Sequence, residues 1–489
     1  MNGQAKHRVT VIKGDGIGPE VVGAAQRIIE AAGVQIAWEV VEAGSSVFAQ
    51  GIASGVPSET IESIRRNKIV LKGPLATPIG KGEKSANVTL RKLFETYANV
   101  RPARELPGVV TPFSGRGIDL TIVRENVEDL YAGIEHMQSP GVAQCLKLIS
   151  HKGSEKVIRL AFAVARAEGR QRVTCVTKSN IMKQTEGMFQ HVFEAVATEF
   201  PDIEADHMLV DNCAHQLVRK PESFGVIVTT NLNGDILSDL SSGLVGGLGF
   251  APGANIGDEV AIFEAVHGTA PDIAGKGLAN PKAMILSGVM MLRHLGELDA
   301  ASTIENAVHL TLAEGKLTAD AAPAGTPGLS TDAFTDAVIE NLGRKSENSR
   351  TRPYRPMVMP SPLPRDPVAV RPQTRRTIGA DIFLESGQFP DTLGRQLDEI
   401  CTATALKLKM ISNRGTRVYP DNGAMTDCVD HYRCRFVLRE PADASEGACD
   451  ADILDLMTRI SKAGLLICQM ERLQEFDGKP AYTKAQGED

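Results

Sequence analysis

Arginines and small polar residues gather in the stretch from residue 73 to residue 104. Ser85, Asn87 and Arg91 stand at positions i, i+2 and i+6 beside a glycine-bearing turn, and Arg101 follows. A guanidinium group presents paired donors in one plane, which match the two oxygens of a carboxylate. The stretch therefore suggests a polycarboxylate pocket. Because most surface arginines are merely solvated, this signal needs support from elsewhere in the chain.

A second polar group follows an apolar, strand-like segment. Arg124 closes this segment, and Glu125, Glu128, Asp129 and Tyr131 come directly after it. These residues could form another carboxylate clamp with a phenolic acid beside it. A polar loop or a helix start explains the same residues, and taken alone this simpler interpretation is favoured.

Two acids stand four residues apart in VTTNLNGDILSDLSSGL, at Asp235 and Asp239. The apolar spacing of this segment indicates a helix, on which residues four apart face the same side. Two carboxylates in that position can share a divalent cation. Acids at this spacing more often lie on a solvated helix face, so this motif also needs corroboration.

The elements that would position these residues alternate between strands and helices. Before residue 345, the strand-like runs RVTVIKG, RVTCVTK and FGVIVTTN are each followed by a helical pattern, and Pro19 suits the first turn of the first helix. Alternation of this kind predicts an α/β domain in which strands are backed by helices.

Taken together, the motifs resemble the decarboxylating dehydrogenases of β-hydroxy acids, the isocitrate and isopropylmalate dehydrogenase family. The resemblance is carried, in the order of the family, by RENVEDLYAGIE, SxNxxxR at 85–91, NLNGDxxSD at 231–239, GFAPGANIG at 249–257 and EAVHGTAPDIAGKGLANP at 264–281. It implies a two-domain α/β core. Residues 1–96 and 247–345 would form a large, cofactor-side domain, and residues 97–246 a small domain with a dimer clasp near residues 132–150.

The residues implied to bind the substrate favour isocitrate. By resemblance, Arg91, Arg101 and Arg124 should hold the carboxylates, while Ser85 and Asn87 contact the group that distinguishes substrates. Isopropylmalate enzymes have apolar residues there, and burying two polar groups against an isopropyl group would cost on the order of 1–3 kcal/mol each. The alternatives are a homoisocitrate, isopropylmalate or tartrate dehydrogenase of the same family, and a chain that keeps the site only as a binding scaffold.

The resemblance also implies a metal ion and a shared active site. Asp235 and Asp239 should bind Mg²⁺ or Mn²⁺ together with Asp211 from a neighbouring subunit. Lys178, which reaches across from the same neighbour, should belong to the network that removes the hydroxyl proton, and Tyr131 should protonate the enolate after carbon dioxide leaves. A homodimer is therefore expected.

The cofactor is not predicted from a G-x-G-x-x-G fingerprint, because GDGIG at 14–18 lacks the spacing. The family instead uses the HGTAP loop, and the implied cofactor contacts are Thr77, Asn180, Glu264, His267, Gly268, Thr269, Ala270, Asp272, Ile273 and Asn280. NADP-using isocitrate enzymes carry a Lys-Tyr pair after this loop, where this chain has Asp272 and Ile273. A carboxylate suits the ribose hydroxyls of NAD and repels a phosphate, so we predict NAD, with NADP as the alternative.

A linker rich in proline and arginine, residues 346–378, precedes a different pattern of elements. Residues 379–489 follow the order β-α-β-β-α-β of a ferredoxin-like α+β domain. Through MISNRGTRVYP and TDCVDHYRCRF they resemble the extra domain of a longer bacterial group of isocitrate dehydrogenases. The acidic balance of this region disfavours RNA, and Cys428, His431 and Cys434 are expected to pack together and not to bind metal. Assembly into a larger oligomer is the preferred hypothesis for this domain.

Composition limits the remaining classes of function. The chain has 489 residues, 42% of them hydrophobic, and a net charge of −7, which gives no general attraction to nucleic acid or to an anionic membrane. Eight cysteines contain no C-x-x-C pair, and no run of 18 apolar residues occurs. We therefore expect a cytoplasmic protein with no nucleic-acid or membrane partner.

Overall fold

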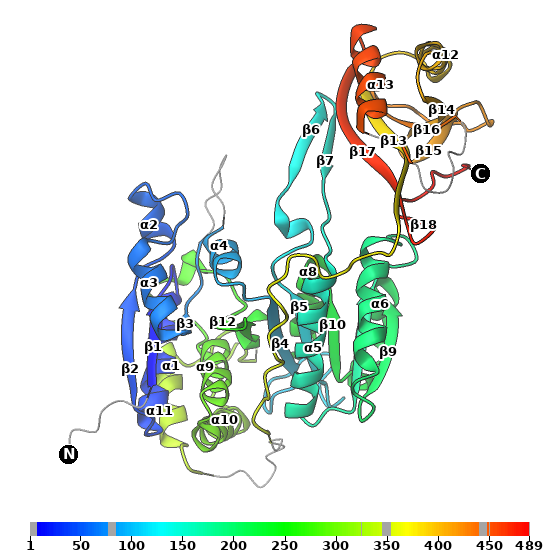
Figure 1. Cartoon of the computed structure of the whole chain (residues 1–489). Helices are drawn as coiled ribbons and strands as arrows, with labels where there is room; N and C mark the ends of the chain where they lie inside the picture. The colour runs from blue at the N-terminus through cyan, green and yellow to red at the C-terminus, as the bar shows by residue number, and fades with distance from the viewer. Residues whose placement is uncertain are drawn as a thin grey trace. The chain divides into compact units, whose positions relative to one another are not determined.

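The computed structural model describes residues 7–76, 85–323, 325–344, 354–439, 447–448 and 450–488. The chain divides into two compact units (Figure 1). The first unit comprises Met1–Ala132 and Leu148–Arg365, and the second comprises Gly133–Lys147 and Asp366–Asp489. The boundaries predicted above for a large and a small domain within the core remain predictions.

A ten-stranded mixed sheet is the framework of the first unit. Its strands lie in the order β2 (Ile36–Val41), β1 (His7–Ile12), β3 (Ile69–Lys72), β12 (Ala261–Ala265), β11 (Pro252–Ile256), β4 (Ala98–Arg104), β5 (Asp119–Glu125), β10 (Val226–Thr229), β8 (Arg172–Thr177) and β9 (Glu204–Leu209). β11 is antiparallel to β12 and β4, and β4 is antiparallel to β5. The other neighbours are parallel. The α/β prediction for the core is confirmed.

Helices flank this sheet along its length (Figure 1). They are α1 (Gly18–Ala31), α2 (Ser45–Ala49), α3 (Ser58–Asn67), α4 (Ala86–Leu93), α5 (His151–Ala167), α6 (Thr185–Ala197), α7 (Val210–Arg219), α8 (Asn231–Val245), α9 (Lys282–His294), α10 (Leu298–Ala313) and α11 (Thr331–Glu340), with short 3₁₀ turns η1 (Leu130–Ala132), η2 (Pro221–Ser223), η3 (Leu248–Phe250) and η4 (Pro271–Ile273). Pro19 occupies the first turn of α1, as predicted. α8 begins directly after Thr230, earlier than the sequence pattern suggested, because Thr230 has the extended backbone of an N-cap residue.

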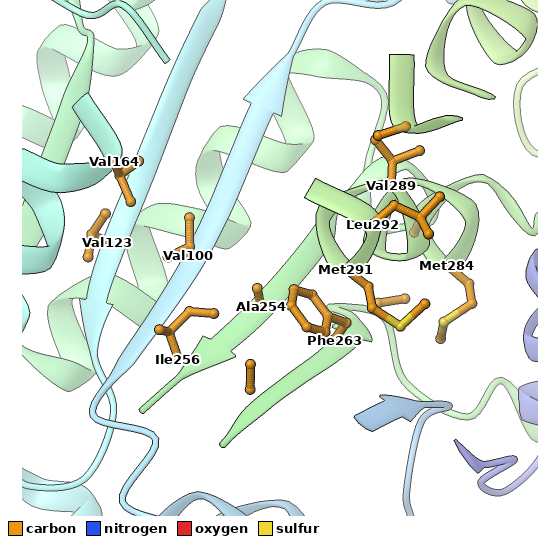
Figure 2. Packing of buried hydrophobic residues seen from close by; sticks show 14 of the residues in the cluster. Val100, Val123, Val164, Ala254, Ile256, Phe263, Met284, Val289, Met291 and Leu292 are labelled. Carbon is orange, nitrogen blue, oxygen red and sulfur yellow. The ribbon is translucent and has the colours of Figure 1, made fainter. Parts of the chain in front are cut away.

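The four central strands, β4, β5, β11 and β12, send successive side chains to opposite faces of the sheet. One face carries the polar residues Asn99, Arg101, Arg124, Asn255 and Glu264. The other face carries Val100, Val123, Ala254, Ile256 and Phe263, which pack with Val164 of α5 and with Met284, Val289, Met291 and Leu292 of α9 (Figure 2). The same strands therefore build a polar surface and the largest apolar core.

The second unit contains a six-stranded sheet with two helices on one face. Its strands lie in the order β15 (Thr416–Tyr419), β14 (Leu406–Asn413), β16 (His431–Leu438), β13 (Arg375–Glu385), β17 (Leu466–Phe476) and β18 (Lys479–Pro480). α12 (Pro390–Cys401) and α13 (Asp450–Lys462) bury Leu397 and Leu456 against Ile382 of β13. β13, α12, β14, β16, α13 and β17 follow the β-α-β-β-α-β order, with β15 and β18 as additional strands, and the ferredoxin-like prediction is confirmed.

One strand of this domain differs from the sequence expectation. In the predicted β-α-β-β-α-β order, the segment LKLKMISNRGTRVYP is the second strand, but it folds into the hairpin of β14 and β15. Arg414 and Gly415 both adopt positive φ, at 50° and 84°. Two consecutive residues with positive φ form the tight turn that suits the twist of a hairpin, so the chain reverses here.

A second hairpin of this unit comes from the middle of the chain. β6 (Glu135–Ser139) pairs with β7 (Val142–Cys145). The Ser139 hydroxyl lies 2.8 Å from Asp430 Oδ1, and the Cys468 thiol lies 3.2 Å from the carbonyl oxygen of Gln138. That this hairpin acts as a dimer clasp remains a prediction.

The linker is extended wherever it is described. Residues 354–374 contain no helix or strand, as their proline content leads one to expect. Residues 354–365 pack along the first unit, where the Arg355 amide donates to Ala167 O (2.9 Å) and Lys152 Nζ donates to Pro364 O (2.6 Å). Within the described part of the chain, no helix is both long and apolar enough to span a membrane.

Candidate functional site

Asp235, in the second turn of α8, lies at the centre of a cluster of charged and phenolic side chains. The Tyr131 hydroxyl donates to Asp235 Oδ2 at 2.6 Å, and Arg101 Nη1 lies 3.3 Å from Asp235 Oδ1. Arg124 forms an ion pair with the same carboxylate, and its guanidinium group lies 4.9 Å from the centre of the Tyr131 ring. Three segments that the sequence singled out separately therefore meet here.

Across the described residues of this cluster and the adjoining Glu264, four cations face three acids: Lys72, Arg91, Arg101 and Arg124 against Asp235, Asp239 and Glu264. Burial, followed by the charges of Arg124 and Arg91, lowers the pKa of Arg101 to about 10. Burial, followed by the charge of Arg91, also lowers the pKa of Arg124. Burial alone would raise the pKa of Asp235, but the arginines and the Tyr131 hydrogen bond outweigh it and lower that pKa. An anion entering the cluster would be stabilised by the same excess of positive charge.

A second network, around Glu264, adjoins the first. Glu264 Oε2 lies 2.6 Å from Lys72 Nζ, and Glu264 Oε1 lies 3.2 Å from Arg91 Nη2. Asn255 donates to Glu264 at 2.7 Å, and Lys72 also donates to Asn87 Oδ1 at 2.9 Å. Although burial opposes it, these cations lower the pKa of Glu264, so this carboxyl group is ionised.

A small cavity of about 60 Å³ joins the two networks. Asn87, Arg91 and Arg101, predicted to bind substrate, line it together with Glu264 and His267, predicted to contact the cofactor. The cavity thus lies between residues predicted to bind the substrate and residues predicted to contact the cofactor. Ser85 directly precedes α4 as its N-cap residue, so α4 carries Ser85, Asn87 and Arg91 as one element.

Asp235 and Asp239 lie one helical turn apart on α8, as the sequence predicted. Burial raises the pKa of Asp239, and the charge of Asp235 adds to this effect, against the opposing charge of Arg101. Two hard oxygen donors whose charges repel each other fit a divalent cation. Among the described residues of one chain, no group of three His, Cys, Asp or Glu side chains could hold a metal ion, so the pair alone does not complete a coordination shell.

Lys178 and Asp211 form a pair of their own. Lys178 Nζ lies 2.7 Å from Asp211 Oδ1, and the Asp211 side chain is 63% exposed. The Lys178 hydrogen bond lowers the pKa of Asp211. Within the described structure, neither residue forms a hydrogen bond or ion pair with the cluster around Asp235. Asn180, two residues after Lys178, is exposed.

The predicted cofactor loop is held in place by the glycine turn at residues 14–18. The Ile17 amide donates to the Thr269 carbonyl at 2.9 Å, and a Cβ at Gly16 would lie 2.0 Å from that same oxygen. Ala270 adopts a positive φ of 39°, and the buried His267 Nε2 has no hydrogen-bond partner among the described residues. A constrained loop with an unpartnered buried nitrogen fits a ligand that supplies the missing contact. From the sequence, this glycine turn was considered only as a cofactor fingerprint, whose spacing it lacks.

Most other predicted residues are placed by the structure. Asn280 donates to Asp320 Oδ2 at 2.8 Å, and Asp272 and Ile273 lie in η4. Thr77 lies outside the described residues. Sequence reasoning missed Lys72, Asn99 and Asn255; Lys72 alone gave a signal, as a lysine that ends an apolar strand.

Comparisons with known proteins agree with this geometry. Residues 8–338 match the isocitrate/isopropylmalate dehydrogenase family, and residues 375–488 match the C-terminal domain of bacterial isocitrate dehydrogenase. A Thermus thermophilus protein named isocitrate dehydrogenase [NADP] is 59% identical over 481 residues, covering 98% of this chain and 96% of that protein. A Rickettsia bellii protein of the same name is 38% identical over 487 residues, covering 98% and 99%. A crystal structure of a Thermus thermophilus protein has a TM-score of 0.93 at 59% identity, covering 99% of this chain and 96% of that one.

The prediction of NAD as cofactor, and hence of an NAD-dependent enzyme, was wrong, because these relatives are named as NADP enzymes. The prediction relied on repulsion between Asp272 and a 2′-phosphate. Asp272 is exposed, where water and salt reduce the interaction of two charges to about 1 kcal/mol or less. Lys276, on the same loop, is also exposed and carries the opposite charge. One surface carboxylate therefore does not exclude a phosphate.

The two family matches together cover nearly the whole described chain, and both relatives align over 98% of it. The chain belongs to the isocitrate/isopropylmalate dehydrogenase family, in the long bacterial form that carries an additional C-terminal domain.

Proposed function

We propose that the protein oxidises isocitrate and releases carbon dioxide to give 2-oxoglutarate, with NADP as the hydride acceptor and Mg²⁺ or Mn²⁺ as an essential ion. The observation that carries this proposal is the grouping of three arginines, Arg91, Arg101 and Arg124, around Asp235, beside a cavity that also touches the cofactor loop. The names of the full-length relatives support the substrate and NADP.

Arg91, Arg101 and Arg124 would bind the carboxylates of isocitrate. In the absence of substrate, Arg101 and Arg124 are occupied by Asp235. A substrate carboxylate would replace Asp235 in these ion pairs and so release the aspartate toward the metal. Ser85 and Asn87 would contact the third carboxylate from the N-terminal turn of α4.

Asp235 and Asp239 would hold the metal together with Asp211 from a second copy of the chain. When bound, the ion would lower the pKa of the substrate hydroxyl group and stabilise negative charge on that oxygen. The proposal of a shared site, and therefore of a homodimer, rests on the Lys178–Asp211 pair, which forms no hydrogen bond or ion pair with the Asp235 cluster among the described residues of one chain.

The proton transfers would be divided between two residues. The network of Lys178 would accept the hydroxyl proton while the hydrogen on C2 leaves as hydride, which gives a ketone. The bond to the departing carboxylate then breaks, carbon dioxide leaves, and the enolate takes a proton on carbon from Tyr131. Burial, followed by the hydrogen bond to Asp235, raises the pKa of Tyr131, so this phenol retains a proton to donate at neutral pH.

The loop from His267 to Asn280, with Glu264, would hold the cofactor, and bound NADP would accept the hydride. This chain has no Lys-Tyr pair after the HGTAP loop to bind the 2′-phosphate of NADP. We therefore assign the 2′-phosphate contact to the cation of Lys276. Asn280, anchored by Asp320, would face the adenine.

Following absorbance of the reduced cofactor tests the reaction directly. We expect purified full-length protein with isocitrate, NADP and Mg²⁺ to give NADPH and 2-oxoglutarate in equal amounts, and isopropylmalate to give at most a small fraction of that rate. Removal of the divalent ion with a chelator should abolish turnover, and Mn²⁺ should restore it. Absence of turnover with isocitrate, with either ion present, would refute the proposal.

A further inference from the structure

A second cavity lies on the opposite face of the strands that carry the candidate site. It has a volume of about 280 Å³, at the small end of the range of ligand-binding cavities. Its walls are the apolar face of β4, β11 and β12, together with side chains of α5 and α9. The linker segment 354–359 closes the remaining side, where Tyr354, Met357 and Met359 line it.

The strands connect this cavity to the candidate site residue by residue. Val100 lines the cavity, and its neighbour Arg101 belongs to the arginine cluster. Phe263 lines the cavity, and its neighbour Glu264 pairs with Lys72 and Arg91 on the other face. Because successive strand residues point to opposite faces, a shift of either strand would move both sites together.

The cavity is mostly apolar, but one buried polar atom without a partner, on Arg293, points to a ligand. Arg293 Nε is buried and has no hydrogen-bond partner among the described residues, although Arg293 Nη2 donates to Glu305 at 2.7 Å. No hydrogen bond of the His294 ring or of the Tyr354 hydroxyl occurs within the described structure. Burial lowers the pKa of His294, so its ring is neutral near pH 7. Buried polar groups without partners are uncommon in native proteins and indicate bound water or a ligand.

The polar groups define the chemistry of that ligand. Arg293 Nε and the Tyr354 hydroxyl are donors, and a neutral imidazole adds one more, so the ligand must offer an acceptor. The charges nearby are already balanced, because Arg293 pairs with Glu305 and Glu168 pairs with Arg170. A strongly charged ligand is therefore not required, and the apolar walls favour a compact hydrocarbon body.

We propose that this cavity binds a small molecule with a compact apolar body and one carbonyl or carboxylate acceptor. The acceptor would meet Arg293 and Tyr354, and the body would lie between Phe263 and the methionines of the linker segment. The site is separate from the proposed catalytic function. Its effect on catalysis, through β4 and β12, rests on that function, so binding is measured directly and apart from turnover.

Indole-3-acetate and indole-3-acetamide are suitable probes, since they share one body and differ in the charge of the acceptor. Binding to the full-length protein is followed by ligand-observed NMR. We expect saturable binding of at least one probe, with a Kd on the order of 1 mM or lower for a ligand of this size. Tighter binding of the acetate would identify the ligand class as a carboxylic acid. Equal or tighter binding of the acetamide would identify it as a neutral carbonyl compound. Failure of both probes to bind saturably would overturn the proposal and leave a cavity filled by water.

Two variants of the linker segment locate the binding. Met357→Trp fills the cavity and should abolish saturable binding. Val358→Trp is the matched control, because Val358 is 82% exposed and does not line the cavity. Equal binding by both variants would place the probe elsewhere and contradict the proposal. An unchanged unfolding temperature of Met357→Trp excludes misfolding as the cause of lost binding.

The acceptor contact is tested by Tyr354→Phe, which removes one oxygen. This variant should weaken the better probe about 3- to 10-fold and leave binding of indole, which has no acceptor, unchanged. Saturation with the better probe should also change KM for isocitrate by about 5-fold. Binding without any change in KM would overturn the coupling through β4 and β12, and an unaltered affinity of Tyr354→Phe would overturn the assigned orientation.

Discussion

Two buried arginines, one in each unit, show how differently the same side chain can be used. Arg435 of β16 is 1% exposed, and its guanidinium group donates to Asp381, Glu488 and the carbonyl oxygen of Thr483. Arg101 of β4 is also buried, but Arg91 and Arg124 stand beside it.

The two environments shift the pKa of the arginine in opposite directions. Burial lowers the pKa of Arg435, yet Asp381 and Glu488 outweigh burial and raise it. At Arg101 burial and two neighbouring cations act together and lower the pKa to about 10. Arg435 therefore completes a closed ion-pair network. Arg101, in contrast, shares Asp235 with Arg124, and its other anion, Asp239 at 3.6 Å, is exposed.

This difference separates a structural ion pair from a binding site more clearly than burial or residue type does. A closed network is stable without any ligand, and removing its centre should unfold the domain. A cluster with excess charge is less stable when empty and gains most when an anion enters. The variants below should affect stability at one arginine and catalysis at the other.

The largest effect on stability is expected from Arg435→Met. The change leaves Asp381 and Glu488 buried, with only Arg433 and Lys409 nearby. We expect the free energy of unfolding to fall by about 3–5 kcal/mol, as when one partner of a buried ion pair is removed. Urea unfolding followed by circular dichroism measures this. Arg433→Met is the control, because Arg433 is more exposed and lies 3.8 Å from Asp381, and it should have a much smaller effect.

Arg101→Met should reduce catalysis strongly and change the stability of the protein only slightly. Asp235 keeps its contacts with Arg124 and Tyr131, so stability should change by less than about 1 kcal/mol. We expect kcat/KM for isocitrate to fall by about 100- to 1000-fold, the cost of removing a buried charged contact to a bound acid. Steady-state kinetics measures this loss, and the comparison would fail if Arg101→Met unfolded the protein while Arg435→Met did not.

Two buried carboxyl groups extend the comparison to acids. Burial raises the pKa of Glu125 to about 7. At Glu488 burial acts the same way, but the Ala485 amide, Arg435 and Lys409 outweigh it and lower the pKa to about 2. Glu125 is protonated in the folded state and ionised in the unfolded state between about pH 4.5 and 7, so its contribution to stability is lost as the pH rises through this range. The contribution of Glu488 is present above pH 4.5 and is lost only as the pH falls toward 2.

Glu125→Gln should therefore be more stable than the unchanged protein at pH 8, by up to about 3 kcal/mol, and equal to it near pH 4.5. The Gln side chain keeps an oxygen that can accept from the Val127 amide. Unfolding in urea at several pH values measures the difference. A difference that does not change with pH would show that the Glu125 carboxyl group does not titrate in this range.

Local chemistry made part of the site predictable from the sequence. Asp235 and Asp239 are four residues apart on one helix, and Arg124 ends an apolar strand, so spacing indicated that the two acids share a face and that the arginine lies at a strand end. The α/β core and the ferredoxin-like domain followed from the order and periodicity of the elements. The assignment of roles needed the family resemblance, because each motif alone had a simpler explanation.

The remaining contacts depend on the order of strands in the sheet, which periodicity does not determine. Asn99 of β4 meets Asn255 of β11, and Lys72 of β3 meets Glu264 of β12, only because these strands are neighbours. The Arg414–Gly415 turn was hidden inside what looked like one long strand. The error about NAD had a similar source, since sequence gives the charge of Asp272 but not its exposure to solvent.

Lys276 extends the comparison to an exposed cation, and the smallest effect is expected there. Lys276→Ala should raise KM for NADP by about 2- to 5-fold at low ionic strength and leave kcat unchanged, because an exposed ion pair contributes about 1 kcal/mol or less and is screened by salt. Asp272→Asn should lower the same KM by a similar factor, since it removes the opposite charge from the same loop. Lys68→Ala, an exposed lysine paired with Glu259, is the control and should change neither constant. If Lys276→Ala raises KM for NADP as much in 0.5 M salt as at low ionic strength, the contact between Lys276 and the 2′-phosphate is buried. The phosphate site would then resemble the buried site of Arg101 and not an exposed ion pair.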